Sequence, residues 1–346
     1  MRTLVRELTY SRPFAWFVLF PALWAGVVVF NRTGRTPWFA YWAMRRLYCI
    51  TRGRSNRWLV RRLASPPAGV GSPVTGVLSG LGEAERDGAL TALRRDGFVV
   101  LGRRLTDAQI ESLIEFARST PARLMPTPVD GPLIECFDPE RPRAIKYDLP
   151  EQALVEHPVV QELLADKSLR DLARRYLGYE PINDLVAMWW STAYSSQPSA
   201  EVAQLYHFDM DRPQFLKLFF YLTDVTSDTG PHCYVRASHR ERPAPLWRDG
   251  RHTDDEVLRL HGADSEVEIT APRGSLIAVD TSGFHKGKPL ARGHRLILQL
   301  EYTSALFGQE YTRIEVPASA FWRAEIAASP VFMTRFSVAR SARVLH

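Results

Sequence analysis

The chain has 346 residues, which is enough for one catalytic domain and an extension, and 45% of its residues are hydrophobic and 24% charged. This composition is ordinary for a folded globular protein and excludes a chain that is disordered over most of its length. The three cysteines, Cys49, Cys136 and Cys233, are odd in number and far apart, which argues against a disulfide framework or a CxxC site. We therefore expect a reducing compartment, the cytoplasm.

Positive charge is concentrated at the N-terminus. Residues 1–65 contain twelve arginines and a single acidic residue, Glu7, so this segment carries +11 and the remaining residues carry −5 of the chain's total of +6. The partner of the N-terminal charge therefore need not be the substrate of the rest of the chain.

An uncharged run of 17 residues, FAWFVLFPALWAGVVVF, extends from Phe14 to Phe30. A helix of this length spans about 25 Å, slightly less than a hydrocarbon core of about 30 Å, and Pro21 is expected to kink it. A second helix is predicted after it, with Thr36 as N-cap and Pro37 in the first turn. That helix is rich in aromatic residues and is followed by further arginines.

Two interpretations of residues 1–65 remain open. Aromatic rings beside arginines are typical of segments that bind the headgroup region of an anionic membrane, and the arginines after the apolar run would place the catalytic part on the cytoplasmic face. Alternatively, the helices fold onto the catalytic domain and their aromatic residues form ordinary core. Nucleic-acid binding is disfavoured, because an apolar run has no use in binding phosphates.

The segment SPPAGVGSPVTGVLSG is rich in Pro, Gly and Ser and predicts a linker over residues 66–85. It would separate an N-terminal helical segment, 1–65, from a catalytic domain, 86–346. That domain should begin with a helix, a strand at Phe98 to Leu101 and a helix capped by Thr106, followed by a helical stretch that ends at Gly178.

From about residue 184 the pattern changes to short strands separated by turns: LVAMWW, LYHFDM, FLKLFFYL, HCYVR, EVEIT, SLIAVD and RLILQLEY. Such a series indicates a barrel or a double-sheet jelly roll. Because helices precede strands and no βαβ units alternate, the predicted fold class is α+β. The sequence has no GxGxxG motif, P-loop or internal repeat, which argues against a nucleotide-binding enzyme.

Three residues are candidates for a metal site. In LYHFD, His207 and Asp209 are two positions apart, so on a strand they point to the same face and can converge on one ion. A facial triad for divalent iron needs one more histidine and leaves positions open for a co-substrate and O2. His285, after the strand SLIAVD, is the best candidate. An HxD pattern alone is a weak signal, because it often occurs by chance.

Basic residues nearby are candidates for binding a carboxylate. Arg295 shares a strand face with Ile297 and Gln299, and a planar guanidinium suits a bidentate carboxylate contact. Arg292 competes with it but lies in a turn, where its side chain should face solvent. Lys217 lies in the middle of a strand. If buried it needs an anion, from a co-substrate or a substrate, but an exposed face is an equally good interpretation.

The segments HFDMDRPQFLKLFFYLTDVTSDTGPHCYVRASHR and PRGSLIAVDTSGFHKGKPLARGHRLILQLEY resemble the core of the phytanoyl-CoA dioxygenase family over about residues 90–305. The resemblance implies a double-stranded β-helix of the jelly-roll or cupin type, flanked by helices, with the N-terminal helical extension outside it. It assigns His207, Asp209 and His285 to Fe(II) and Arg295 to the distal carboxylate of 2-oxoglutarate. Gln204 and Lys217 are expected to line the cofactor pocket, and Tyr147, Trp189 and Trp190 are further candidates for its lining.

The chain departs from the family pattern at two places. Ala237 precedes Ser238 and His239 where the family usually has a glycine, which could alter that turn. His232 lies in a strand at a position that is more often apolar. We interpret His232 as pocket lining or surface and His239 as a structural hydrogen-bonding residue.

The resemblance implies an Fe(II)/2-oxoglutarate-dependent dioxygenase that uses O2 to hydroxylate an unactivated C–H bond of a small molecule and releases succinate and CO2. The family accepts fatty acyl thioesters, amino-acid derivatives and natural-product skeletons, and the apolar N-terminal segment favours a lipid-like substrate among these. The presence of Asp209 favours hydroxylation over halogenation, since halogenases of this type lack the carboxylate so that chloride can bind iron. The alternative is a non-catalytic or isomerase-like metal-binding β-barrel, which would form no succinate. Small-molecule substrate, O2 and a membrane surface through residues 1–65 are the expected partners, with no nucleic acid.

Overall fold

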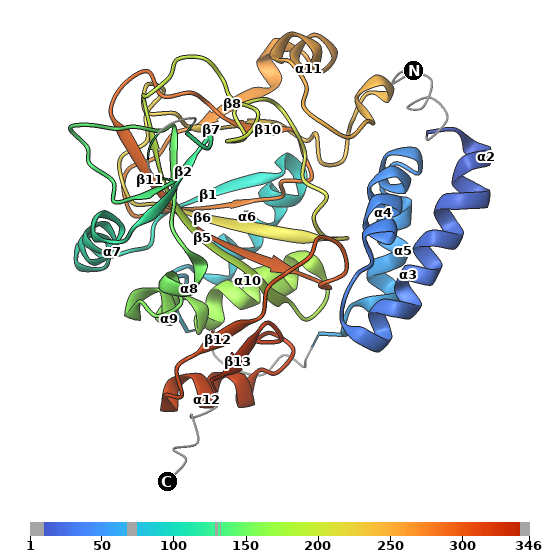
Figure 1. Cartoon of the computed structure of the whole chain (residues 1–346), viewed down its shortest axis with the longest axis horizontal. Helices are drawn as coiled ribbons and strands as arrows, with labels where there is room; N and C mark the ends of the chain where they lie inside the picture. The colour runs from blue at the N-terminus through green and yellow to red at the C-terminus, as the bar shows by residue number, and fades with distance from the viewer. Residues whose placement is uncertain (1–9, 68–74, 129–130, 132, 340–346) are drawn as a thin grey trace.

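The computed structural model describes residues 10–67, 75–128, 131 and 133–339, and Figure 1 shows a β-sheet core with helices around it. An eight-stranded antiparallel sheet is the larger of two sheets that form the core. Its strands, in spatial order, are β1 (Phe98–Arg103), β9 (Ser275–Val279), β6 (Phe215–Tyr221), β11 (His294–Thr303), β5 (Ile182–Thr192), β4 (Lys146–Asp148), β2 (Ala122–Met125) and β3 (Ile134–Glu135).

The smaller sheet has three antiparallel strands, β10 (His285–Gly287), β7 (His232–Val235) and β8 (Glu266–Ile269). Strands that are distant in sequence are neighbours in both sheets, as in a jelly roll. The predicted α+β class and double-stranded β-helix core are confirmed. A short parallel pair, β12 (Ile314–Val316) and β13 (Phe336–Val338), lies with helix α12 (Ala320–Ala328) near the C-terminal end of the described chain.

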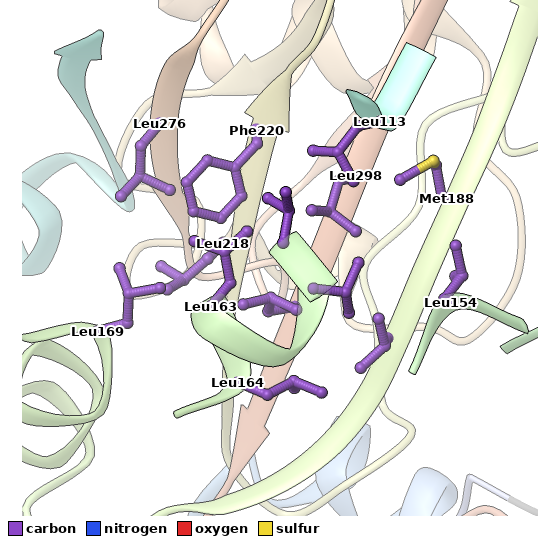
Figure 2. Packing of buried hydrophobic residues seen from close by; sticks show 14 of the residues in the cluster. Leu113, Leu154, Leu163, Leu164, Leu169, Met188, Leu218, Phe220, Leu276 and Leu298 are labelled. Carbon is purple, nitrogen blue, oxygen red and sulfur yellow. The ribbon is translucent and has the colours of Figure 1, made fainter. Parts of the chain in front are cut away.

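The two faces of the large sheet have different chemistry. On β11, Leu296, Leu298 and Leu300 are buried in the main apolar cluster, where Figure 2 shows Leu298 beside Leu218 and Phe220 of β6. The alternate residues on β11 line a cavity on the opposite face. The period-two pattern of RLILQLEY therefore predicted both faces correctly.

Helices cover the apolar face. They are α6 (Glu83–Asp96), α7 (Asp107–Ser119), α8 (Glu151–Leu154), α9 (Pro158–Leu164) and α10 (Lys167–Leu177). As predicted, the Thr106 hydroxyl accepts a hydrogen bond from the Gln109 amide and caps α7. The single predicted stretch before Gly178 is two helices, because the Asp166 carboxylate accepts from the Ser168 and Leu169 amides and starts α10 anew.

One predicted strand is wrong. The LYHFDM segment is not part of either sheet; it forms only isolated backbone pairs, between Tyr206 and His252 and between His207 and His285. The strand β10 was not predicted separately, because it is only three residues long and begins at His285 itself. Helix α11 (Asp254–His261) lies in the loop that supplies His252.

The N-terminal apolar run is helical from Arg12 to Thr33. It comprises α2 (Arg12–Phe14), a π-helical turn (Ala15–Leu19) and α3 (Phe20–Thr33). Pro21 lies in the first turn of α3, directly after the wide turn, which accommodates a residue that has no amide hydrogen to donate. By length and composition this helix could cross a membrane, but Leu19, Leu23 and Val27 are buried within the protein.

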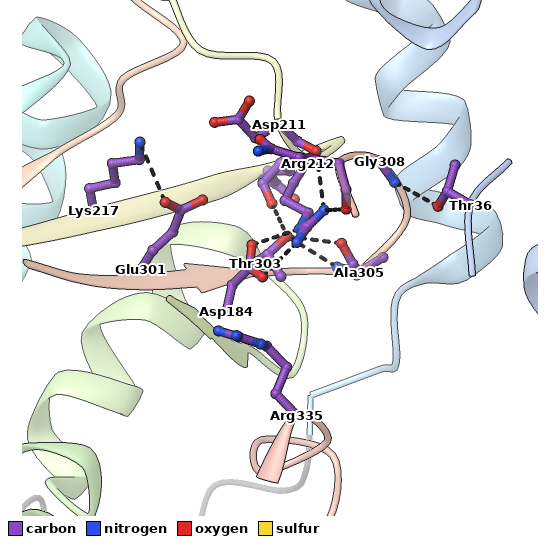
Figure 3. Close-up of polar contacts among 12 residues, drawn as sticks. Thr36, Asp184, Asp211, Arg212, Lys217, Glu301, Thr303, Ala305, Gly308 and Arg335 are labelled. Carbon is purple, nitrogen blue, oxygen red and sulfur yellow. Dashed lines mark hydrogen bonds and ion pairs between the residues drawn. The ribbon is translucent and has the colours of Figure 1, made fainter. Parts of the chain in front are cut away.

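Two more helices, α4 (Trp38–Ile50) and α5 (Arg54–Leu63), connect α3 to the catalytic domain (Figure 1). The predicted N-cap of α4 is wrong. Pro37 occupies that position, and the Thr36 hydroxyl accepts a hydrogen bond from the Gly308 amide at 2.9 Å instead (Figure 3). The Phe30 and Phe307 rings pack edge to face, so the N-terminal helices share a core with the catalytic domain.

The predicted linker falls partly outside the described residues, since 68–74 are not described. Its last part packs on the catalytic domain, where the Val77 amide donates to Asp166 at 2.7 Å and the Leu78 amide donates to Ser168 at 3.0 Å. The division of the chain into residues 1–65, 66–85 and 86–346 stays a prediction. All three cysteines are free, and Cys49 and Cys233 are buried.

Gly26 provides a test of how closely α3 packs on α4. A Cβ atom at Gly26 would lie 2.1 Å from the Ala40 Cβ, whereas Gly88 on α6 has open space around it. Gly26→Ala should lower the free energy of unfolding by about 2 kcal/mol through overpacking, while Gly88→Ala should raise it by up to about 1 kcal/mol. Chemical denaturation measures both, and equal effects would contradict this packing of α3 on α4.

Ala237 adopts a left-handed backbone conformation with φ of 62°, which explains the glycine usual at this position. Ala237→Gly should therefore raise the free energy of unfolding by about 1 kcal/mol, and Ala237→Val should lower it, because a β-branched side chain tolerates this conformation least. Denaturation curves of the two variants check the prediction. A destabilised glycine variant would show that the turn is not strained.

Candidate metal centre

Two backbone hydrogen bonds between His207 and His285 bring the predicted ligands together. The His207 amide donates to the His285 carbonyl at 3.1 Å, and the His285 amide donates to the His207 carbonyl at 2.9 Å. Asp209 lies 3.6 Å from the Nε2 atom of each histidine, through a different carboxylate oxygen for each. One ligand atom from each of the three residues lies within 4.8 Å of the others, so the group could hold a metal ion.

The remaining ring nitrogens fix the orientation of both imidazoles. Nδ1 of His207 lies 2.9 Å from the Leu205 carbonyl, and Nδ1 of His285 lies 3.0 Å from the Gly283 carbonyl. A carbonyl oxygen can only accept, so each Nδ1 carries the proton and donates it. Each Nε2 is then left unprotonated and directed toward Asp209, as in metal-binding histidines.

The protonation states also suit a divalent cation. Burial lowers the pKa of His207 to about 4 and that of His285 well below its usual range, so both rings are neutral at pH 7. Burial raises the pKa of Asp209, but Lys217 and the two histidines outweigh this and hold it well below its usual range. The group therefore offers two neutral imidazoles and one carboxylate.

Lys217 is buried, and the protein itself supplies its anion, the Asp209 carboxylate. Its Nζ lies 2.7 Å from Asp209 Oδ2 and 3.4 Å from Glu301 Oε2, and the second contact is visible in Figure 3. Burial raises the pKa of Glu301 to about 8, although Lys217 acts in the opposite direction. Lys217 thus balances the charge behind a triad carboxylate, and its predicted role in cofactor binding stays a prediction.

Arg295 is the buried cation with unused hydrogen-bond donors in this cavity. The side chain is 5% exposed, and Nη2 donates to the Ser191 hydroxyl at 3.2 Å. Its Nε and Nη1 atoms have no partner among the described residues. A buried guanidinium with two unpartnered nitrogens is costly unless it binds an anion, and a carboxylate fits that geometry. Arg292, the rejected competitor, is 74% exposed and pairs with Asp228, as predicted.

The cavity that joins the triad to Arg295 has a volume of about 590 Å³. Gln204 and Trp189 line it as predicted, although the Gln204 Oε1 atom accepts a hydrogen bond from the Ser199 amide and so stabilises its own loop. Tyr147 and Trp190 do not line the cavity; both are fully buried in the main core. Their strand positions point to the apolar face of the sheet.

His232 and His239 behave as interpreted. The His232 ring stacks on His285 with ring centroids 5.2 Å apart and lines the cavity, and burial lowers its pKa to about 3, so it is neutral. It is not one of the three grouped ligands. His239 lies away from the cavity, and its Nε2 is 3.0 Å from the Arg94 carbonyl oxygen.

The sequence analysis missed the N-terminal contribution to this cavity. Arg45 of α4 lines it, and its guanidinium makes a two-point ion pair with Asp249 at 2.6 and 2.9 Å. Tyr41, one turn earlier, donates to Asp211 at 3.3 Å. Only the helical i, i+4 spacing of Tyr41 and Arg45 hinted that they share a face, and nothing in the sequence indicated which part of the domain this face contacts.

Comparisons with known proteins come from three searches. The family model described as "Phytanoyl-CoA dioxygenase (PhyH)" matches residues 93–292, which is more than half of the chain and includes the triad, with Arg295 three positions beyond its end. The search among curated proteins found no match.

Several solved structures are similar to the chain. EctD from S. alaskensis with bound Fe shares 20% identity and a TM-score of 0.46, covering 70% of this chain and 80% of its own. HygX from Streptomyces hygroscopicus with nickel, 2-oxoglutarate and hygromycin B bound shares 17% identity and a TM-score of 0.44, with 68% and 91% covered. The non-heme alpha ketoglutarate dependent epimerase SnoN from nogalamycin biosynthesis shares 16% identity and a TM-score of 0.47, and the match covers 64% of this chain and 84% of SnoN.

These structures are distant likenesses, whereas the family model matches the sequence directly and includes the three grouped ligands and every strand of the two core sheets except β11. Two neutral histidines and one ionised aspartate are a ligand set that suits divalent iron. The chain belongs to the phytanoyl-CoA dioxygenase family, whose members are Fe(II)/2-oxoglutarate-dependent oxygenases.

Proposed function

We propose that this protein is an Fe(II)/2-oxoglutarate-dependent dioxygenase that hydroxylates an unactivated C–H bond of a small molecule. His207, Asp209 and His285 hold the iron, and Arg295 binds the distal carboxylate of 2-oxoglutarate. The single observation that carries the proposal is the pair of unpartnered guanidinium nitrogens, Nε and Nη1, on buried Arg295 in the same cavity as the triad. A protein that only bound a metal would have no use for a buried cation at this position.

Iron with its co-substrate supplies the oxidising chemistry: one atom of O2 enters succinate as 2-oxoglutarate loses CO2, and the other becomes the hydroxyl of the product. The residues of the chain position the reactants. Arg295 orients 2-oxoglutarate by a bidentate contact, and Phe219 and Ile297 on the same sheet face cover the centre with apolar surface that excludes water. Retention of Asp209 supports hydroxylation.

The cavity suits a substrate that has an apolar part and a polar or anionic part. Its apolar residues include Leu185, Ala187, Val202, Ala203, Phe219, Leu290 and Ile297. Its basic residues include Arg251, which has no ion pair or hydrogen bond within the described ranges and whose pKa is lowered by burial. A small lipid-like molecule with an acidic group would match both kinds of surface.

The catalytic assignment is tested by oxygen-dependent conversion of 2-oxoglutarate to succinate with iron-loaded protein and candidate substrates. His207→Ala should abolish succinate formation and weaken metal binding at least tenfold, because two of three ligands remain. Iron content after dialysis and succinate yield are the two readouts. Normal turnover by this variant would contradict the triad. If added substrate increases succinate formation by the wild type, the alternative of a non-catalytic β-barrel is excluded.

Arg295 should separate co-substrate binding from metal binding. Arg295→Gln should raise the KM for 2-oxoglutarate at least tenfold, since a charge-assisted bidentate contact is lost, and should leave metal binding within twofold of the wild type. Arg292→Gln is the matched control, because Arg292 carries the same charge three positions away but faces solvent. Equal KM values for the two variants would contradict the role of Arg295.

We further propose that the N-terminal helices hold the protein on the cytoplasmic face of an anionic membrane. Trp16, Phe17 and Trp38 are 68%, 82% and 80% exposed, so they are not the core residues of the alternative interpretation. Figure 1 shows α2 and α3 at the edge of the molecule, and Arg12 and Arg32 at the ends of this helix are exposed. Exposed aromatic rings between arginines match an interface of lipid headgroups and acyl chains.

Vesicle binding tests this attachment. The full chain should sediment with vesicles that contain phosphatidylglycerol, and the triple variant Trp16→Ser, Phe17→Ser and Trp38→Ser should bind at least tenfold more weakly because it loses the buried apolar area. Ile134→Ser is the control, since Ile134 is 61% exposed on β3 of the catalytic domain. Equal binding by the triple variant and the control variant would sink the proposal.

A further inference from the structure

A second, larger cavity of about 980 Å³ lies between α5 and the catalytic domain. One wall is the face of α5 formed by Asn56, Arg57, Val60 and Arg61, and the opposite wall includes the segment from His239 to Pro243. Among its lining residues, this cavity shares only Asp209 with the metal cavity. Nothing described so far uses this cavity.

Its lining is strongly basic. The arginines that line it are Arg52, Arg57, Arg61, Arg212, Arg240 and Arg242. Two of these are neutralised, because Arg212 pairs with Asp184 and Arg240 pairs with Glu241. Arg52, Arg57 and Arg61 are exposed and make no ion pair or side-chain hydrogen bond within the described part of the chain. The positive charge of the α5 wall is therefore available to a ligand.

Arg242 adds a buried cation to this wall charge. The residue is only 9% exposed, and Nη2 donates to the Ser282 carbonyl, but Nε and Nη1 have no partner among the described residues. The guanidinium lies 3.7 Å from the centre of the Phe208 ring, which fixes its plane. Two unused donors on a nearly buried cation are unfavourable in the absence of an acceptor and favour an anionic ligand.

The first turn of α5 also favours an anionic ligand in this cavity. Gly53 has φ of 79° and begins the helix, and Arg52, Gly53, Asn56 and Arg57 all line the cavity. The N-terminal end of a helix of ten residues presents a partial positive charge and favours a phosphate there. The helix end and Arg242 approach the same space from separate elements.

The acidic residues of the lining do not cancel this charge. Asp209 pairs with Lys217 and Glu241 pairs with Arg240, so the carboxylate of Asp280, which accepts from the Tyr176 hydroxyl at 2.5 Å, is outnumbered by the arginines without an ion pair. The apolar part of the lining includes Tyr48, Val60, Phe215, Trp247 and Leu260. The cavity therefore combines a cationic wall with apolar surface and is several times larger than one phosphate group.

We propose that this cavity is a binding site for a phosphorylated ligand, with the phosphate between Arg57, Arg61 and Arg242 and the organic part on the aromatic surface. Guanidinium groups bind phosphate oxygens through two parallel hydrogen bonds, which explains the use of arginine here. The ligand is a soluble phosphate ester or the headgroup of an anionic lipid; both offer the same chemistry. The proposal does not depend on the oxygenase function.

Calorimetry with metal-free full-length protein and inorganic pyrophosphate tests the site. The double variant Arg57→Gln with Arg61→Gln should bind pyrophosphate at least tenfold more weakly than the wild type. The matched control is Arg54→Gln with Arg62→Gln, which removes the same charge from the same helix outside the cavity lining and should change affinity less than twofold. Arg295→Gln should bind normally, which separates this site from the 2-oxoglutarate site.

Equal losses in the two double variants, or no pyrophosphate binding by the wild type at millimolar concentration, would overturn the proposal. A second experiment decides the source of the phosphate. It compares binding to phosphatidylcholine vesicles that contain phosphatidic acid with binding to vesicles that lack it. If only the Arg57, Arg61 double variant loses its preference for phosphatidic acid, the ligand is a lipid headgroup. If pyrophosphate binding depends on these arginines but the vesicle preference does not, the ligand is a soluble phosphate ester.

Discussion

The paired amide and carbonyl groups of His207 and His285 hold the metal centre together. These two hydrogen bonds join a loop that belongs to neither sheet to the first residue of β10, more than seventy positions later in the chain. Because the backbone atoms are fixed, the two imidazoles lie side by side and Asp209 contacts both. β7 and β11 then supply His232 and Arg295 to the same cavity. The sheets thus provide a rigid frame for a site that is built largely from their ends.

Buried charge links the site to the core behind it. Asp209 contacts Lys217, and Lys217 contacts Glu301, so an acidic ligand residue is held ionised inside the protein without a fixed metal. Two other buried arginines are not balanced in this way. Arg295 and Arg242 each keep two guanidinium nitrogens, Nε and Nη1, without partners in the described structure, and each lines a cavity. Incompletely satisfied cations in cavities are the structural features from which ligand chemistry can be inferred here.

The described N-terminal helices pack on the catalytic domain, and membrane attachment is a proposal about their exposed side. One side of α3 packs on α4 and on Phe307, so it cannot contact lipid while the protein is folded in this way. The π-helical turn that precedes α3 in the same continuous helix exposes Trp16 and Phe17. A helix with one face in the protein core and the other face exposed fits a position on a membrane surface better than across it. α4 and α5 meanwhile supply arginines to the two cavities, so this segment is structurally part of the catalytic unit.

The family and its jelly roll were predicted from the resemblance of ordered motifs, and the family model confirms the family. The structure brings His207, Asp209, His285 and Arg295 to one cavity, and their roles stay predictions. Residue chemistry and spacing were sufficient for the α+β class and most of the strands, because alternation along a strand is a local property of a chain. They predicted a strand at LYHFDM that does not exist, since the pairing of His207 with His285 is a long-range contact. They also left Lys217 undecided, because its partner Asp209 depends on how a loop crosses β6. Only the tertiary structure placed Arg45 and Arg242 beside cavities. Burial and unsatisfied donors depend on which segments meet in space, and a single sequence does not encode these meetings in any local pattern.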